Sequence, residues 1–403
     1  MPESLSITAP DPVKHRTEMF DLIAKVFSNG GYYWFRDYLA RGYIDKSHYD
    51  YAASRIGHAE GKTVSHFGVW GYTMRIGRAR VRTGGIGAVA TSADYRGRGY
   101  MDHTAHASLS AMRDLGYDFS ILFGISNFYH KFGYTRAWSD ENYYVPVSDL
   151  PSEALERKVE AFKVEPREDL AKLYNRHFAR ATGTAVRPTY RATLYPGKEF
   201  QGLLWKNAKR QVEGYVLFVR GGQRLDCIEA VGEVEQVLRT LAGEARGQHA
   251  SEVRFEGLPH DSELARRLRR GTCRSEALFN RCGGAMIRTV NLQQALTKMA
   301  DELAHRLAGS ALRGFKGELL IADARETAVL AIGKSGVRVM DKPAKGVRNA
   351  IRGGDEVAQL LIGTDPVTEI ASGFGTRFSG AGRDLAEALF PAQHPILHQP
   401  DRY

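Results

Sequence analysis

The sequence has little of what marks exported, membrane-embedded or metal-binding proteins. It holds three cysteines in 403 residues, Cys227, Cys273 and Cys282, an odd number without CxxC spacing. Reduced thiols in a cytoplasm are the simplest interpretation. No apolar run approaches the ~18 residues of a membrane span, and the N-terminus MPESLSITAPDPVKHR contains no apolar signal core. We therefore expect a cytoplasmic protein with no membrane span.

Acidic residues are outnumbered by basic ones, since the sequence has 56 Lys and Arg but only 46 Asp and Glu, for a net charge of +10. Two clusters carry much of the excess: Arg75, Arg78, Arg80 and Arg82, and then Arg266, Arg267, Arg269, Arg270 and Arg274. Along residues 78–82 arginines alternate with apolar residues, as on the solvated face of a sheet. Leu264 and Leu268 leave the second cluster on the outer face of a helix. Because no nucleic-acid reading motif accompanies this charge, we expect no nucleic-acid partner.

The length predicts two to three domains. Near the N-terminus, residues 13–27 have the apolar spacing of an amphipathic helix that stops at Asn29-Gly30-Gly31. An aromatic cluster at 32–35 follows, and it either packs on the core or forms the wall of a substrate cleft. Residues 63–70, 72–76 and 78–83 alternate as antiparallel strands joined by glycine turns.

The most informative stretch runs over residues 84–138. It predicts a strand at 87–91, the turn Arg96-Gly97-Arg98-Gly99, a helix at 101–115, a strand at 119–123 and a short helix carrying Tyr129. Glycines let backbone N–H groups approach a phosphate, and the helix N-terminus and the arginines add positive charge. The turn is therefore either an anion site or a solvated basic loop.

Two other patterns in this region are weaker. The string at 85–90 matches GxGxxA, but its glycines open a strand rather than a helix, which argues against a dinucleotide fold. His103 and His106 lie one helical turn apart and His130 follows, but nothing makes them converge on one point. We therefore expect surface histidines and no metal.

A second block favours the anion site over the solvated loop as the interpretation of the basic turn. This block is Phe128-Tyr129-His130-Lys131-Phe132-Gly133-Tyr134. The turn resembles the acyl-CoA pyrophosphate loop of the GNAT acetyltransferase superfamily, and Tyr129 resembles the tyrosine of that family's final core motif. The usual loop ends in a small residue where this one has Met101. That departure is similar to the enhanced intracellular survival (Eis) type, whose loop is rich in arginine.

The resemblance implies acetyl-CoA as co-substrate and assigns the site. The implied CoA-binding positions are Val89, Thr91, Arg96, Gly97, Arg98, Gly99 and Tyr100. Phe27 and Trp34 are implied in the substrate cleft, where the family also carries acids and this sequence has Ser28 and Asn29. Tyr129 is implied as the general acid, because a phenol with a pKa of about 10 stays protonated at neutral pH.

The rest of the chain fits the same resemblance, which implies a mixed α/β or α+β fold with tandem GNAT-like domains and a sterol-carrier-type domain. We expect a catalytic GNAT domain over residues 1–150, with 143–147 as its closing strand. A degenerate GNAT-like domain without the RGxG loop and the FYxxxGY block should occupy 151–287. The sterol-carrier-type α+β domain should occupy 288–403, beginning with a helix at 292–307.

The sequence ends in Asp401-Arg402-Tyr403, similar to the Eis-type ending in which the terminal carboxylate enters the first domain's site. The implied function is an acetyl-CoA-dependent N-acetyltransferase acting on a primary amine of an aminoglycoside, a polyamine or a lysine. Tyr129 would be the acid and the Tyr403 carboxylate the base, in a homo-oligomer that is a hexamer by resemblance. The alternatives are a lipid-binding or scaffold protein with a relict GNAT half, and a GNAT enzyme that uses a longer acyl-CoA.

Overall fold

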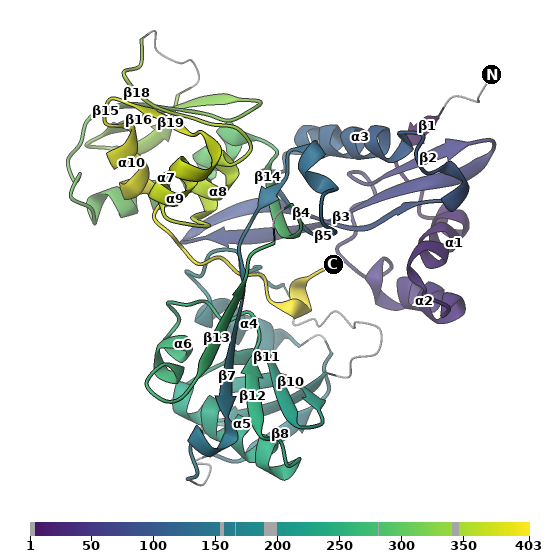
Figure 1. Ribbon diagram of the computed structural model, residues 1–403, viewed down its shortest axis with the longest axis vertical. Coiled ribbons are helices and arrows are strands. Elements are labelled where there is room, and N and C mark those ends of the chain that lie inside the picture. The colour runs from purple at the N-terminus through teal and green to yellow at the C-terminus, as the bar shows by residue number, and fades with distance from the viewer. Residues whose placement is uncertain (1–4, 154–156, 166, 189–199, 281, 341–345) are drawn as a thin grey trace. The chain divides into compact units, whose positions relative to one another are not determined.

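The computed structural model describes residues 5–153, 157–165, 167–188, 200–280, 282–340 and 346–403. The chain forms two compact units. One contains the chain up to Ala137, Asn280–Ala392 and Tyr403, and the other contains Trp138–Phe279 and Gln393–Arg402. Figure 1 shows three sheets, of which the first and third belong to the first unit.

The first sheet has seven strands in the order β1-β2-β3-β4-β5-β14-β6. Its strands are β1 (Ser6–Thr8), β2 (Arg55–Ala59), β3 (Lys62–Ile76), β4 (Ala79–Thr91), β5 (Phe119–Gly124), β14 (Gly284–Thr289) and β6 (Thr135–Arg136). Neighbours are antiparallel except β4 and β5, which are parallel because a helix connects them.

Helices cover both faces of this sheet (Figure 1). They are α1 (Arg16–Phe27), α2 (Tyr32–Tyr38) and α3 (Tyr100–Asp114), and a π-turn at Leu39–Tyr43 follows α2. The apolar stripe of α3, with Met101, Ala105, Leu109 and Met112, is buried against Phe67 and other strand residues. The apolar residues that repeat every 3.6 positions in the sequence thus form the face of α3 that packs on the sheet.

The third sheet, also in the first unit, has the order β17-β16-β15-β18-β19. Its strands are β17 (Gly336–Val339), β16 (Thr327–Gly333), β15 (Gly317–Ala322), β18 (Asn349–Arg352) and β19 (Arg377–Ser379), and its helices are α7 (Leu292–Ala308), α8 (Val357–Ile362), α9 (Val367–Phe374) and α10 (Gly382–Leu389). Asn291 caps α7 by accepting the Gln294 N–H at 3.0 Å. This is the expected α+β domain that follows the GNAT-like domains.

The second unit repeats the plan of the first domain around the sheet β13-β7-β12-β11-β10-β9-β8. The strands are β13 (Arg274–Leu278), β7 (Asp140–Pro146), β12 (Glu252–Phe255), β11 (Arg224–Val231), β10 (Val212–Gly221), β9 (Gln201–Lys206) and β8 (Val159–Phe162), with α4 (Glu168–His177), α5 (Val234–Gly247) and α6 (Glu263–Leu268). Parallel β11 and β12 are joined through α5, as β4 and β5 are through α3. The tandem arrangement is confirmed.

Two details of the strand prediction are wrong. The strands expected at 63–70 and 72–76 are one strand, β3, which continues through Gly71, and those at 78–83 and 87–91 are one strand, β4. Gly71 makes no turn. A Cβ there would lie 2.5 Å from the Tyr117 hydroxyl oxygen, so the glycine instead leaves room for that side chain.

The chain also exchanges strands between the two sheets near the expected domain boundaries at 150 and 287, which remain predictions. The strand expected to close the first domain, 143–147, lies mostly in β7 and pairs with β12 and β13 of the second sheet. Residues 284–289 return as β14 and pair with β5 and β6 of the first sheet. Because the paired strands are so distant in sequence, no local sequence pattern marks the two places where the chain passes from one sheet to the other.

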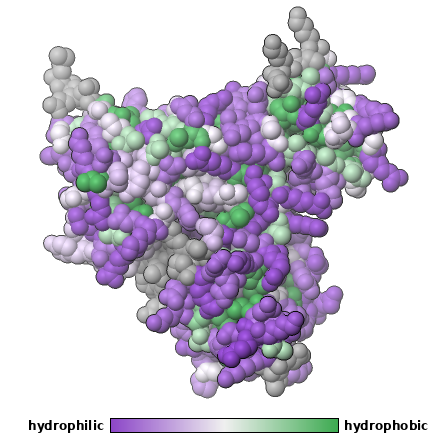
Figure 2. All heavy atoms as spheres, turned by 180° about the vertical axis from the view of Figure 1, so that it is seen from behind, coloured by the Kyte–Doolittle hydropathy of each residue, from purple (hydrophilic) through white to green (hydrophobic). Residues whose placement is uncertain are grey.

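The basic clusters have mixed environments. Arg78, Arg80 and Arg82 are exposed and alternate with buried residues as expected, but Arg75 is 1 % exposed and belongs to the interior. Hydrophilic residues cover most of the surface seen in Figure 2. Among the described residues, no helix has the length and apolar character needed to cross a bilayer.

Candidate active site

The candidate site begins where β4 leaves its neighbours. Parallel pairing of β4 with β5 ends at Ile86 and Leu122. Against β3 the register shifts in the next residues, so Ala88 and Val89 have no Cα partner in the described pairing, and pairing resumes before Thr91. A strand that separates from its neighbour exposes backbone groups at the gap, and these are the groups that a ligand can use.

A short loop links β4 to α3 and has the geometry of an anion site. Gly97 and Gly99 have φ values of 74° and 75°, a conformation that glycine adopts without strain, and a Cβ on either would point into open space. Gly99 is the N-cap of α3, and no side chain caps this helix among the described residues. The first N–H groups of α3 are therefore open to an anion.

The two loop arginines are exposed and held by weak local contacts. Arg98 lies over the Tyr95 ring at 4.8 Å and donates to the Asp94 carbonyl at 3.0 Å, while Arg96 donates to the Thr91 carbonyl at 3.4 Å. Tyr100 stacks on Tyr95 at 6.1 Å. Both guanidinium groups stay solvated, so turning toward a phosphate would cost them little.

Tyr129 begins a 3₁₀ turn, Tyr129–Phe132, which follows β5 after a short link over residues 125–128. Its ring covers Gly124, where a Cβ would lie 2.4 Å from Cδ2 of the tyrosine, and only 9 % of the residue is exposed. Burial raises the pKa of Tyr129 to about 12. No described residue hydrogen-bonds its hydroxyl, and the Val89 side chain packs on the same apolar cluster. Tyr129 and Val89 therefore share one wall.

Tyr403 lies on β4 and β5. Its ring rests on Gly85, and its hydroxyl donates to the Ile121 carbonyl at 2.8 Å. Trp70 stacks on the ring at 6.3 Å between centroids with an interplanar angle of 15°. The backbone carbonyl carbon of Tyr403 is 3.2 Å from where a Gly87 Cβ would be. This backbone group therefore lies where β4 separates from its neighbours, which we call the opening of β4.

Phe27 and Trp34 lie at the exposed end of a row of aromatic rings. Phe27 is 41 % exposed and Trp34 is 51 % exposed. Trp34 stacks on Tyr38 at 5.7 Å, Tyr38 on Tyr43 at 5.2 Å, and Tyr43 meets Trp70 at 4.8 Å. Because Trp70 in turn stacks on the ring of the last residue, the row leads from the exposed rings to the opening of β4.

Sequence reasoning missed Tyr43 and Trp70 as parts of this site. The Tyr43 hydroxyl lies 2.7 Å from where a Gly87 Cβ would be, and the Trp70 indole N–H donates to the Tyr43 carbonyl at 2.8 Å. No motif marks either residue. Only the aromatic cluster at 32–35 pointed toward this region.

The second unit offers no equivalent site among its described residues. Only Gly232 and Glu233 separate β11 from α5, and the Glu233 carboxylate caps that helix by accepting the N–H groups of Glu235 and Gln236. A negative charge already occupies the helix N-terminus, so an incoming phosphate would be repelled.

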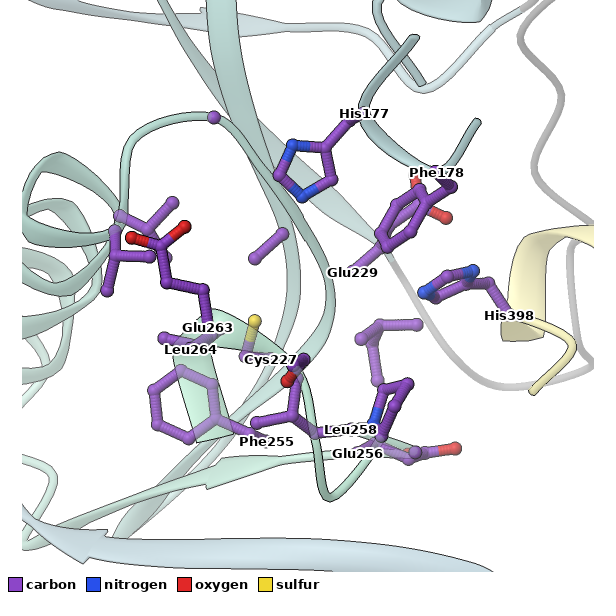
Figure 3. Close-up of a pocket in the computed structure, with 18 residues that line it drawn as sticks. His177, Phe178, Cys227, Glu229, Phe255, Glu256, Leu258, Glu263, Leu264 and His398 are labelled. Atoms are coloured by element: carbon purple, nitrogen blue, oxygen red, sulfur yellow. The ribbon is translucent and has the colours of Figure 1, made fainter. Parts of the chain in front are cut away.

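The second unit does contain a small cavity of about 80 Å³ beside β11, and His177, Glu229 and His398 are among its lining residues (Figure 3). Glu229, His398 and Asp401 lie close enough together to be considered as metal ligands. However, Arg187 donates to both carboxylates, at 2.6 and 2.8 Å, so its guanidinium group already holds the place that a cation would take between them. The donor set therefore fits an internal ion pair better than a cation site.

Comparison with known proteins gives a family match over the first domain. Residues 14–137 match the model of the family described as Acetyltransferase (GNAT) domain. A search of curated proteins with this sequence finds no match. The match supports an N-acetyltransferase enzyme, with acetyl-CoA as its co-substrate.

Solved structures resemble the whole chain. The GCN5-related N-acetyltransferase from Anabaena variabilis is 15% identical, with a TM-score of 0.78 over 99% of this chain and 100% of the other. The GCN5-related N-acetyltransferase from Kribbella flavida is 17% identical, with a TM-score of 0.71 over 100% and 99%. Eis1 from Mycobacterium abscessus is 14% identical, with a TM-score of 0.66 over 98% and 99%. At these identities the likeness establishes the fold.

Proposed function

We propose that the protein transfers the acetyl group of acetyl-CoA to a primary amine by direct attack. The observation that carries the proposal is the position of the Tyr403 backbone carbonyl group at the opening of β4. In a GNAT-type domain that opening is where an acetyl thioester would lie, next to the arginine loop. A base at this point would meet an incoming amine, and the arginine loop would hold the pyrophosphate.

In this mechanism the Tyr403 carboxylate takes a proton from the amine, directly or through water. The amine nitrogen then forms a bond to the thioester carbonyl carbon, while the Val89 N–H stabilises the charge that develops on the carbonyl oxygen. The C–S bond breaks and the CoA sulfur receives a proton from Tyr129. The role of the carboxylate requires that Tyr403 be the last residue of the protein, which intact mass measures.

The pKa of Tyr129 limits how this residue can act as a proton donor to the leaving sulfur. With a pKa of about 12 the phenol stays protonated at any working pH. A thiol has a pKa of about 8.5, so complete proton transfer from the phenol to a free thiolate would be uphill by about 3.5 units, roughly 5 kcal/mol. Tyr129 therefore acts first as a hydrogen-bond donor to the leaving sulfur, and the proton moves as negative charge builds up there.

The acceptor class follows from the aromatic row. Trp34, half exposed at the outer end of the row, is an aromatic ring that can attract an ammonium group. Asp37, half exposed and paired with Arg41 four residues on, adds a carboxylate nearby in sequence. These features support an aminoglycoside, polyamine or lysine amine. The hexamer and the sterol-carrier-type character of the last domain remain predictions, and light scattering measures the first.

The test is a free-thiol release assay with acetyl-CoA against aminoglycosides, polyamines and lysine peptides. Tyr129→Phe should lower kcat about 100-fold or more, in the range of general acid catalysis. Tyr134→Phe is the matched control, because it removes another buried hydroxyl of the same cluster, one that bonds Ser120 at 2.6 Å. Full activity of Tyr129→Phe would refute the assigned acid.

The same assay separates the alternatives. A lipid-binding or scaffold protein would show no turnover, and Tyr129→Phe would change nothing that the assay detects. An enzyme for longer acyl groups would bind a long-chain acyl-CoA clearly more tightly than acetyl-CoA in isothermal titration.

A further inference from the structure

The irregularity in β4 is held by a buried pair of side chains, His66 on the neighbouring strand β3 and Tyr49 in the segment that precedes β2. Between the pairs His66–Ala90 and Gly68–Gly87, β4 has one residue more than β3. Ala88, inside this bulge, has a φ of 48°, a left-handed conformation that residues with a side chain rarely adopt. Such a conformation persists only where neighbouring groups fix it.

The imidazole of His66 supplies that fixation. Its Nδ1 is 2.7 Å from the Ala88 carbonyl oxygen and its Nε2 is 2.7 Å from the Tyr49 hydroxyl. A carbonyl oxygen only accepts hydrogen bonds, so Nδ1 carries the proton, and Nε2 then accepts from Tyr49. His66 is fully buried, and burial lowers its pKa to about 4. The imidazole is therefore neutral at physiological pH and keeps this tautomer.

Fixing the Ala88 carbonyl also fixes the next N–H. The peptide between Ala88 and Val89 is trans and planar, so its C=O and N–H point in opposite directions. When His66 draws the carbonyl oxygen to its side, the Val89 N–H must point away from His66. Val89 has no Cα partner in the described pairing of β4 with either β3 or β5.

We propose that Tyr49 and His66 are positioning residues that aim the Val89 N–H at the carbonyl oxygen of the acetyl thioester. This inference rests on the proposed function, because it assigns these residues to the same site. Neither residue touches the substrate. They act through the peptide of the bulge, which turns a strained backbone conformation into a preorganised donor.

The test compares two nearly isosteric variants, His66→Leu and His66→Asn. Both leave the same space behind, but Asn retains a donor close to the position of Nδ1 and Leu does not. We expect kcat to fall about 10- to 100-fold in His66→Leu, somewhat less than for outright loss of an oxyanion donor. His66→Asn should recover most of this loss.

Binding provides the readout that a merely structural role would not move. CoA has no thioester carbonyl, so its Kd in isothermal titration should stay within about two-fold in both variants. The wild-type protein should bind acetyl-CoA more tightly than CoA, and this difference in Kd should disappear in His66→Leu but not in His66→Asn. Tyr49→Phe, which deletes only the hydroxyl, should lower kcat about 3- to 10-fold. Tyr117→Phe, which removes a buried hydroxyl bonded to Asp50 at 2.6 Å, should leave kcat unchanged.

The outcomes are distinguishable. An active wild-type protein in which His66→Leu and His66→Asn have equal kcat would overturn the positioning role and leave the proposed function standing. CoA affinity falling in parallel with kcat would overturn it as well, since that indicates a collapsed site. A wild-type protein without acetyl transfer to any amine would overturn the proposed function and, with it, this inference.

Discussion

Gly85→Ala tests the position of Tyr403 with a single methyl group. A Cβ at residue 85 would lie 2.0 Å from Cε1 of the Tyr403 ring and 2.2 Å from its Cδ1 and Cζ. Real Cβ atoms essentially never approach other atoms within 3.0 Å, so the ring must move. The φ of Gly85 is not in the left-handed region, so alanine itself fits the backbone.

The structure gives the magnitude of the response. The ring is held by the Tyr403 hydroxyl bond to the Ile121 carbonyl, worth about 1 kcal/mol, and by contacts with the rings of Trp70, Tyr72 and Phe123, of which the Trp70 stack alone is worth about 1 kcal/mol. A loss of about 2 kcal/mol corresponds to a roughly 30-fold shift toward the withdrawn state. We expect the clash to exceed this holding energy and the C-terminal residue to leave β4.

Carboxypeptidase A measures the withdrawal directly, because it releases a C-terminal tyrosine only when the chain end is accessible. The release rate should rise about 30-fold in Gly85→Ala, and acetyl transfer should fall to the level of a variant that lacks Tyr403. CoA affinity should stay within a few-fold in both.

Gly84→Ala is the matched control. Its Cβ would meet the flexible end of Met112 at 2.3 Å and Val69 at 3.0 Å, and no atom of Tyr403 is among its nearest neighbours. It should cost stability without changing the release rate of tyrosine. If Gly85→Ala showed the release rate and the turnover of the wild type, Tyr403 would not occupy β4 and its carboxylate would not be the base.

Two further predictions concern stability. Arg187→Met should destabilise the second unit by about 3–5 kcal/mol in urea unfolding, because it leaves the buried carboxylates of Glu229 and Asp401 unpaired. The control Arg220→Met, at an exposed pair, should cost at most about 1 kcal/mol. Equal losses of stability in the two variants would contradict the buried pairing. Burial lowers the pKa of His66 to about 4 when folded, against about 6.5 when unfolded, so the unfolded chain binds more protons between these values and stability falls as pH drops through this window. From pH 8 to pH 5 this histidine should cost about 2 kcal/mol, and His66→Asn should lack that component of the unfolding curve.

The loop, the helix after it and the tyrosine turn were predictable because their signals are local. Gly97 and Gly99 take the left-handed conformations that only glycine adopts easily, and the apolar spacing from Met101 to Met112 shows one face of a helix. Such features depend on a few consecutive residues, so they can be predicted from a single sequence. Tyr129 was expected in a short helix after the strand at 119–123, and it lies in the 3₁₀ turn that follows β5.

The sequence by itself therefore determined the GNAT-type core, the glycine conformations of its arginine loop and the tandem plan of the domains. Tertiary structure alone decided how β7 and β14 are exchanged between sheets and which glycines of β4 are covered by Tyr403. It also decided that His66 supports the bulge at Ala88, 22 residues away. These features are contacts between segments far apart in the chain. Their energies arise from packing and hydrogen bonding across that separation, and no short pattern of residues encodes them.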